Sequence, residues 1–118
     1  MSVEEILKAK NIRLPETPAP AGSYVPVVVS GNLAFLSGVL PREGNRIVFQ
    51  GKAGESVNAA QASEAARLCA LNALSVLRSH FGSLDAISRI VRMTGYVQTG
   101  TAFYDIPKVM NGASDLLK

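Results

Sequence analysis

Two small polar residues, Ser30 and Ser37, interrupt the apolar run YVPVVVSGNLAFLSGVLP, which extends from Tyr24 to Pro41. A hydroxyl in such a run either satisfies a buried backbone group or lines a site. Tyr24 adds a third hydroxyl. The chemistry open to this set is hydrogen bonding to a small polar ligand, provided that the fold brings Tyr24 and Ser37 together.

The run has the pattern of a β-hairpin. Two apolar and β-branched segments, residues 25–30 and 33–38, are separated by Gly31-Asn32, a pair suited to the positive φ angles of a two-residue turn. Side chains alternate along a strand, so this turn predicts that Tyr24 and Ser37 are diagonal neighbours on one side. Pro26, which faces Ser37, has no N–H, and the pairing can end there and leave both hydroxyls partly open.

Bulk composition indicates one globular domain over residues 1–118, with 47% hydrophobic and 18% charged residues. No targeting signal or membrane span is evident, so a cytoplasmic protein is expected. A single cysteine, Cys69, and a single histidine, His80, offer no ligand set for zinc, and no cofactor is expected. The 12 basic residues are scattered, so a solvated surface is expected rather than nucleic-acid binding.

Three helices are predicted from caps and periodicity. Residues 2–10 begin with a capping box, Ser2 to Glu5, and a proline-rich connector follows as far as residue 22. A long helix begins after Asn58, whose capping partner is Gln61, and stops at Gly82. Its expected buried face comprises Ala62, Ala65, Ala66, Cys69, Ala70, Ala73, Leu74, Leu77 and Phe81. The last helix follows Asp105 and runs to Lys118.

Two further strands are predicted. RIVFQG, residues 46–51, indicates a short one. Residues 88–99 indicate a longer one, with Val91, Met93, Gly95 and Val97 on one face and Arg92, Thr94, Tyr96 and Gln98 on the other. After the first helix the order is therefore βββαβα, and the fold class is α+β. We read Cys69 as packing rather than as a nucleophile, and His80 as complementing the helix dipole.

Three blocks of sequence carry a resemblance: AGSYVPVVVSGNLAFLSGVLP, RIVRMTGYVQT and KVMNGASDLL. They resemble the YjgF family, also called the RidA or Rid family and often labelled endoribonuclease L-PSP. The likeness covers nearly the whole chain from Leu14 onward. It implies a chorismate-mutase-like fold, a mixed sheet backed by two helices, and a homotrimer with small-molecule sites between subunits. The strand VPVVVS is apolar on both faces, and the helices can cover only one of them. This agrees with a homotrimer, in which a partner subunit would cover the other face.

The resemblance also implies an activity, the hydrolysis of reactive enamines and imines such as 2-aminoacrylate to 2-keto acids and ammonia. By the family pattern the catalytic residues are Tyr24, Ser37 and Asn111, and Gly38 and Arg92 bind the substrate. The residues alone leave structural roles open: Tyr24 and Asn111 satisfying backbone groups, Ser37 a strand-end hydroxyl and Arg92 a solvated charge. Val39 stands where many members have glutamine.

Two further expectations follow from the resemblance. In the family's catalytic domain, strands after the second helix carry a substrate-binding arginine and an acidic residue, and the 118-residue sequence has no such positions. We therefore expect the natural protein to be longer, or another segment to fill the gap. If the chain ends at Lys118, we expect deaminase activity to be weak or absent, because Arg92 would have to substitute for the missing arginine. The alternative functions are a non-catalytic trimer that binds a small carboxylate or a partner protein, and, with less support, an RNA-cleaving inhibitor of translation.

Overall fold

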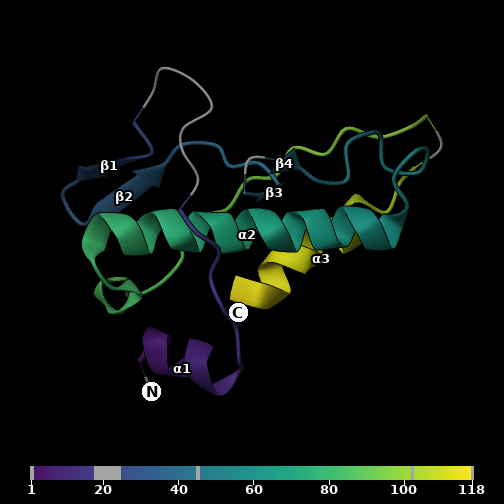
Figure 1. Ribbon diagram of the computed structural model, residues 1–118. Coiled ribbons are helices and arrows are strands. Elements are labelled where there is room, and N and C mark those ends of the chain that lie inside the picture. Colours follow the sequence, from purple (N-terminus) through teal and green to yellow (C-terminus); the bar gives the residue numbers. More distant parts are fainter. Residues whose placement is uncertain (1, 18–24, 45, 102, 118) are drawn as a thin grey trace.

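The computed structural model describes residues 2–17, 25–44, 46–101 and 103–117. Its elements are α1 (Val3–Ala9), β1 (Val27–Ser30), β2 (Leu33–Leu36), β3 (Arg42–Glu43), β4 (Arg46–Ile47), α2 (Ala59–Phe81), the 3-10 turn η1 (Leu84–Ala86) and α3 (Ile106–Leu117). Helix α2 is the centre of the arrangement: the strands lie on one side of it, α1 lies on the other, and α3 packs along it (Figure 1). The α+β class is confirmed.

Local signals place the ends of the first two helices. The Ser2 hydroxyl accepts a hydrogen bond from the Glu5 N–H at the start of α1. At the start of α2, both bonds of the capping box between Asn58 and Gln61 are present, and Gly82 ends the helix in the left-handed conformation. Helix α3 begins at Ile106, directly after Asp105, whose carbonyl oxygen accepts from the Val109 N–H. Lys118 lies outside the described residues.

The hairpin has the predicted register. Strands β1 and β2 are antiparallel, with Ser30 opposite Leu33 and Val28 opposite Phe35. Gly31 in the turn has a φ of 59°, as a two-residue hairpin turn requires. The turn chemistry was therefore sufficient to predict which residues face each other.

The predicted strand at residues 46–51 is mostly wrong. The strand comprises Arg46–Ile47, paired with Arg42–Glu43 in a two-stranded sheet separate from β1 and β2, and the Val48 N–H donates to the carbonyl oxygen of Pro41. Phe49 and Gly51 have φ angles of 57° and 134°, which interrupt an extended strand. The described chain thus holds two small antiparallel sheets in place of one mixed sheet.

The predicted strand at residues 88–99 is also wrong as a hydrogen-bonded element. The segment is irregular up to Gln98, and its recorded pairing is a bridge between Thr99 and Ala53. Part of the alternation does hold, because Gly95 lies against Met110 of α3 while Tyr96 is 94% exposed. Alternation of side chains every two residues predicts which way they point. A hydrogen-bonded strand pair also needs the backbone of a neighbouring strand.

The predicted buried face of α2 is largely wrong. Of its nine residues Ala62 and Ala70 are buried and the other seven are half-buried, whereas residues outside that stripe are buried: Leu68, Leu71, Asn72, Ser75 and Val76. The reason is that α2 has neighbours on several sides: α3, the strands and the segment after α1. One core cluster joins Ala53, Val57, Ala62 and Val109, with Val97 and Phe103 packed against it.

Candidate functional site

Ser37 lies one residue beyond β2, and its surroundings match the predicted register. Its N–H and its hydroxyl both donate to the carbonyl oxygen of Pro26, at 2.9 and 3.2 Å. The side chain is half-buried, and Gly38 beside it is exposed. Since the hydroxyl proton is used by Pro26, the oxygen of Ser37 can accept a hydrogen bond from a ligand. Tyr24, the predicted neighbour, lies outside the described residues.

The chain that leaves Ser37 and Gly38 is attached to α2 by a buried asparagine. Asn72 is 1% exposed, and its Nδ2 donates to the carbonyl oxygens of Leu40 and Arg42, each at 3.0 Å. Hydrophobic periodicity could not identify this residue, because the pattern counts asparagine as polar and therefore places it on the outer face. Asn72 orients the segment that follows the Ser-Gly motif.

A second buried polar residue on α2 was missed for the same reason. The Ser75 hydroxyl donates to the carbonyl oxygen of Pro15 at 2.7 Å and lies 3.2 Å from the Thr17 hydroxyl oxygen. This contact fastens the segment after α1 to the middle of α2. Asn72 and Ser75 both hold irregular backbone against α2. Such backbone needs hydrogen-bond partners when it is buried, and these two side chains supply them.

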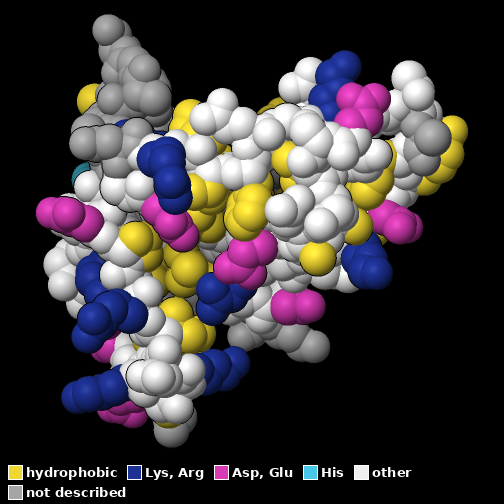
Figure 2. Space-filling view, turned by 45° about the vertical axis from the view of Figure 1, so that its right-hand side comes forward, with side chains coloured by type: hydrophobic (Ala, Val, Ile, Leu, Met, Phe, Trp, Pro, Cys, Tyr) yellow, Lys and Arg dark blue, Asp and Glu magenta, His cyan; other side chains and the backbone are white. Residues whose placement is uncertain are grey.

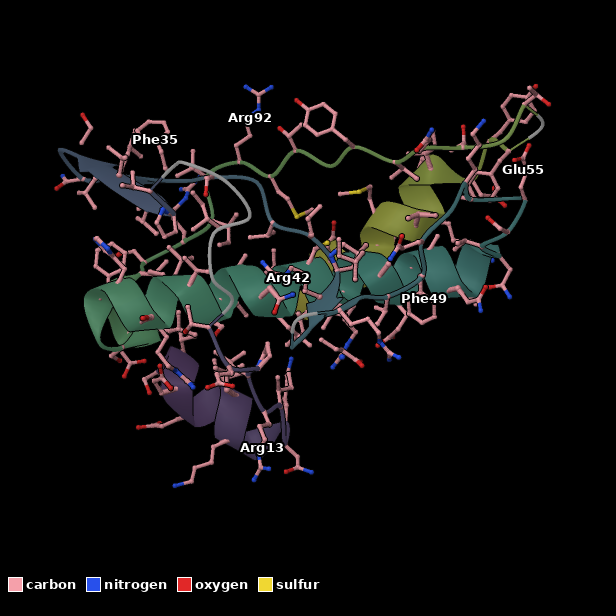
Figure 3. All side chains as sticks on the ribbon, turned by 45° about the horizontal axis from the view of Figure 1, so that its top comes forward. Arg13, Phe35, Arg42, Phe49, Glu55 and Arg92 are labelled. Carbon is pink, nitrogen blue, oxygen red and sulfur yellow. The ribbon has the colours of Figure 1, made fainter. Side chains whose placement is uncertain are left out.

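Arg92 is exposed in the irregular segment before Thr99. Figure 3 shows Arg92 and Phe35 on the same side of α2, both pointing away from the helix. Among the described residues no ion pair is recorded for Arg92. A guanidinium so placed is available to bind a carboxylate.

The same segment and the hairpin expose many large hydrophobic side chains. Phe35 is 57% exposed and Val91 is 67% exposed. The others in these two segments are Val25, Val28, Val29, Leu33, Ile90, Met93 and Tyr96. Figure 2 shows hydrophobic side chains reaching the surface of one face among basic and acidic ones. Exposed apolar surface of this extent is typical of an interaction surface.

Asn111 is the remaining predicted catalytic residue that the structure describes. It is exposed on α3 and lines a pocket of about 540 Å³ whose other lining residues are Lys10, Ile12, Ser63, Arg67, Lys108, Gly112, Asp115 and Leu116. Neither Ser37, Gly38 nor Arg92 belongs to this lining. In this pocket Asn111 and Ser37 do not meet. A cleft that these residues share between subunits stays a prediction.

Neither Cys69 nor His80 has the surroundings of a reactive group. Burial raises the pKa of the Cys69 thiol to about 11, which leaves almost no thiolate at neutral pH. The exposed His80 ring contacts the ring of its neighbour Phe81 edge to face. Over the residues that the structure describes, no group of three or more His, Cys, Asp or Glu side chains could hold a metal ion. No described helix is long and apolar enough to cross a membrane.

Comparison with known proteins gives a consistent result. The family model described as "YjgF/chorismate mutase-like, putative endoribonuclease" matches residues 4–118. Protein TCP17 of Trypanosoma cruzi is 36% identical over 111 residues, which make up 94% of this chain and 69% of that protein.

Two crystal structures are similar to this one. A protein of unknown function from Agrobacterium tumefaciens has a TM-score of 0.84 and 37% identity, with 98% of this chain and 69% of that chain covered. A "putative endoribonuclease" from Shewanella oneidensis has a TM-score of 0.92 and 32% identity, with coverage of 98% and 77%. The chain therefore belongs to the YjgF/chorismate mutase-like family, as the motifs at Ser37 and Arg92 predicted, and has that family's α+β fold.

Proposed function

We propose that this protein hydrolyses reactive enamines and imines, such as 2-aminoacrylate, to 2-keto acids and ammonia. The observation that carries the proposal is the position of Ser37 and Gly38, which match the family's Ser-Gly motif. The Ser37 side chain is half-buried and held by Pro26, and the following segment is held by Asn72. A polar group fixed in this way at the margin of an exposed apolar surface can orient a small substrate.

We further propose that the active unit is a cytoplasmic homotrimer with its clefts between subunits. The exposed hydrophobic side chains of the hairpin and of residues 90–96 support this, because exposing so many to water is unfavourable and a second copy of the same surface can cover them. An intersubunit cleft would also allow Asn111 of one subunit to approach Ser37 of another.

In the proposed reaction, Arg92 binds the substrate carboxylate, and Ser37 and Gly38 orient the imine. Tyr24 and Asn111 complete the site according to the family pattern. An enamine first becomes the imine as a proton moves from its nitrogen to its methylene carbon. A water molecule then adds to the imine carbon and a proton passes to the nitrogen, which gives a carbinolamine. The carbon–nitrogen bond then breaks, ammonia leaves with the bonding electrons and a proton, and the 2-keto acid remains. Such chemistry depends on positioning and on stabilisation of charge rather than on a strong nucleophile.

Two other functions are compatible with family membership. One is a non-catalytic protein that binds a small carboxylate or a partner protein at the same cleft. The other is RNA cleavage, because the family and the Shewanella structure are both described as a "putative endoribonuclease". The chain's single histidine, exposed at the end of α2, supplies no His pair for acid–base cleavage of RNA.

One set of assays separates the three functions. Ammonia and 2-keto acid are measured after addition of the protein to freshly generated 2-aminoacrylate, with RNA cleavage and carboxylate binding measured in parallel. We expect release faster than in buffer and no cleavage of RNA. Release at the rate found in buffer refutes the deaminase; saturable binding of a carboxylate then supports the binding protein, and RNA cleavage that follows the protein through purification supports the nuclease.

A further inference from the structure

The pocket that contains Asn111 lies on the helical side of the molecule. The C-terminal end of α3 and the segment leaving α1 are on the same side of α2 (Figure 1). The pocket has a volume of about 540 Å³, which lies in the range of small-molecule sites. Of the residues proposed for imine hydrolysis, the lining contains Asn111 but not Ser37, Gly38 or Arg92.

The backbone forms this pocket in two places. Gly112 of α3 lies so close to α2 that a Cβ added to it would overlap the carbonyl oxygen of Ser63. At the other wall the chain turns at Asn11, which has a φ of 55°, and the Ile12 N–H donates to the carbonyl oxygen of Leu7 at 2.9 Å. The close helix contact and the turn bring three separate parts of the chain around one hollow.

The lining is rich in cations. It contains Lys10, Arg67 and Lys108 against a single carboxylate, Asp115. Arg67 also contacts Glu64 on its own helix, but at 3.8 Å and with both side chains well exposed, so this pair contributes at most about 1 kcal/mol. Within the described part of the chain, no ion pair is recorded for Lys10 or Lys108. Two ammonium groups thus stand at the pocket without a recorded carboxylate partner.

The remaining lining residues define what kind of anion would fit. Ser63 has a hydroxyl and Asn111 has an amide, and both can donate hydrogen bonds to an oxyanion. Ile12 and Leu116 are apolar and half-buried, so they can contact a hydrocarbon part. The combination of cations, neutral donors and apolar wall is that of a site for a small organic acid.

We propose that the pocket between Lys10, Arg67 and Lys108 binds a small organic anion, a carboxylate or phosphate group attached to a short apolar chain. Lys10, Arg67 and Lys108 attract the oxyanion, Ser63 donates to it, and Ile12 and Leu116 contact the chain. Asn111 is shared with the site proposed for imine hydrolysis, but the test of anion binding does not use that reaction.

The test is a titration of the protein with butyrate, butyl phosphate and 1-butanol at constant ionic strength, followed by NMR of the backbone amides. We expect saturable shifts at Ser63 and Gly112 with at least one anion and none with the alcohol. The two anions distinguish a carboxylate from a phosphate ligand. The proposal is overturned if neither anion saturates, or if the saturating shifts map to residues outside the pocket.

Matched variants distinguish binding in this pocket from attraction of the anion by the net charge of the protein. Lys10→Gln combined with Lys108→Gln removes two charges inside the pocket, and Lys8→Gln combined with Lys52→Gln removes two outside it. We expect the first pair to weaken binding about tenfold and the second less than about twofold. Equal weakening would show that only net charge attracts the anion. Arg67→Ala against Arg46→Ala repeats the comparison, so that misfolding of one variant leaves a second test.

Discussion

Asn72, buried in the middle of α2, donates a hydrogen bond from Nδ2 to the carbonyl oxygen of Leu40 at 3.0 Å. The same nitrogen donates to the carbonyl oxygen of Arg42, also at 3.0 Å. These bonds attach the segment between the Ser37–Gly38 motif and β3 to the longest helix. A polar side chain in a core position is thereby satisfied, and the backbone that follows the candidate site is held in one place.

Replacement of Asn72 by leucine should therefore destabilise the protein. Leucine has a similar volume but can make neither bond, so we expect the free energy of unfolding to fall by about 1–3 kcal/mol. Urea unfolding followed by circular dichroism measures it. The control is Asn111→Leu, at an exposed asparagine with no recorded side-chain hydrogen bond, where a change within about 0.5 kcal/mol is expected. Equal stability of the two variants would contradict the role assigned to Asn72.

The proposed function predicts separate effects at Ser37 and Arg92. Ser37→Ala should lower kcat/KM for imine hydrolysis by about tenfold or more while costing only about 1 kcal/mol of stability, because the hydroxyl is partly open. Arg92→Ala should raise KM more than Arg89→Ala, a change at another exposed arginine of the same segment. Steady-state kinetics on freshly generated 2-aminoacrylate decide both. Full activity in Ser37→Ala and Arg92→Ala would show that the site lies elsewhere.

The ion pair between Glu4 of α1 and Arg78 of α2 should stabilise the protein to a degree that depends on pH. The hydrogen bond from Arg78 and then the bond from the Leu84 N–H lower the pKa of Glu4 below its usual value of 4.5. A lowered pKa in the folded state means that the contribution to stability is present above pH 4.5 and is lost as the pH falls through the folded-state pKa.

Glu4→Gln tests this contribution. Because both side chains of the Glu4–Arg78 pair are partly exposed, we expect a loss of only about 1 kcal/mol at pH 7. The difference from the unchanged protein should shrink in acid. Glu5→Gln, at the exposed neighbouring carboxylate, should change stability very little. Thermal unfolding between pH 3 and pH 7 measures both variants, and a Glu4→Gln effect that does not vary with pH would count against the ion pair.

Cys69 should be slow to react with thiol reagents. With a pKa of about 11, its thiolate fraction at pH 8 is on the order of one in a thousand. Reaction with a disulfide reagent should therefore be slow in the folded protein, rise with pH beyond pH 9, and become fast in urea. Since the chain has one cysteine, the signal has a single source. Rapid reaction of the folded protein at pH 7 would contradict the predicted burial.

The sequence by itself determined the elements whose signals are local. The capping residues Ser2 and Asn58 and the stop at Gly82 predicted two helices within a residue or two, and Gly31-Asn32 predicted the hairpin and its register. These features depend on neighbouring residues and on backbone angles that glycine permits, so a short stretch is sufficient to specify them. The motifs around Ser37 were also sufficient to predict the family.

Only the tertiary structure decided which segments pair and which residues meet. The alternation at residues 88–99 is that of a strand, yet a ladder needs a partner backbone, and the described chain supplies one at Thr99. The burial of Asn72 and Ser75 depends on irregular backbone far away in the sequence that needs hydrogen-bond donors. The place of Asn111 beside Lys10 and Arg67 follows from how α3 packs on α2 and from where the segment that leaves α1 runs. Such contacts join residues distant along the chain, and no local pattern encodes them.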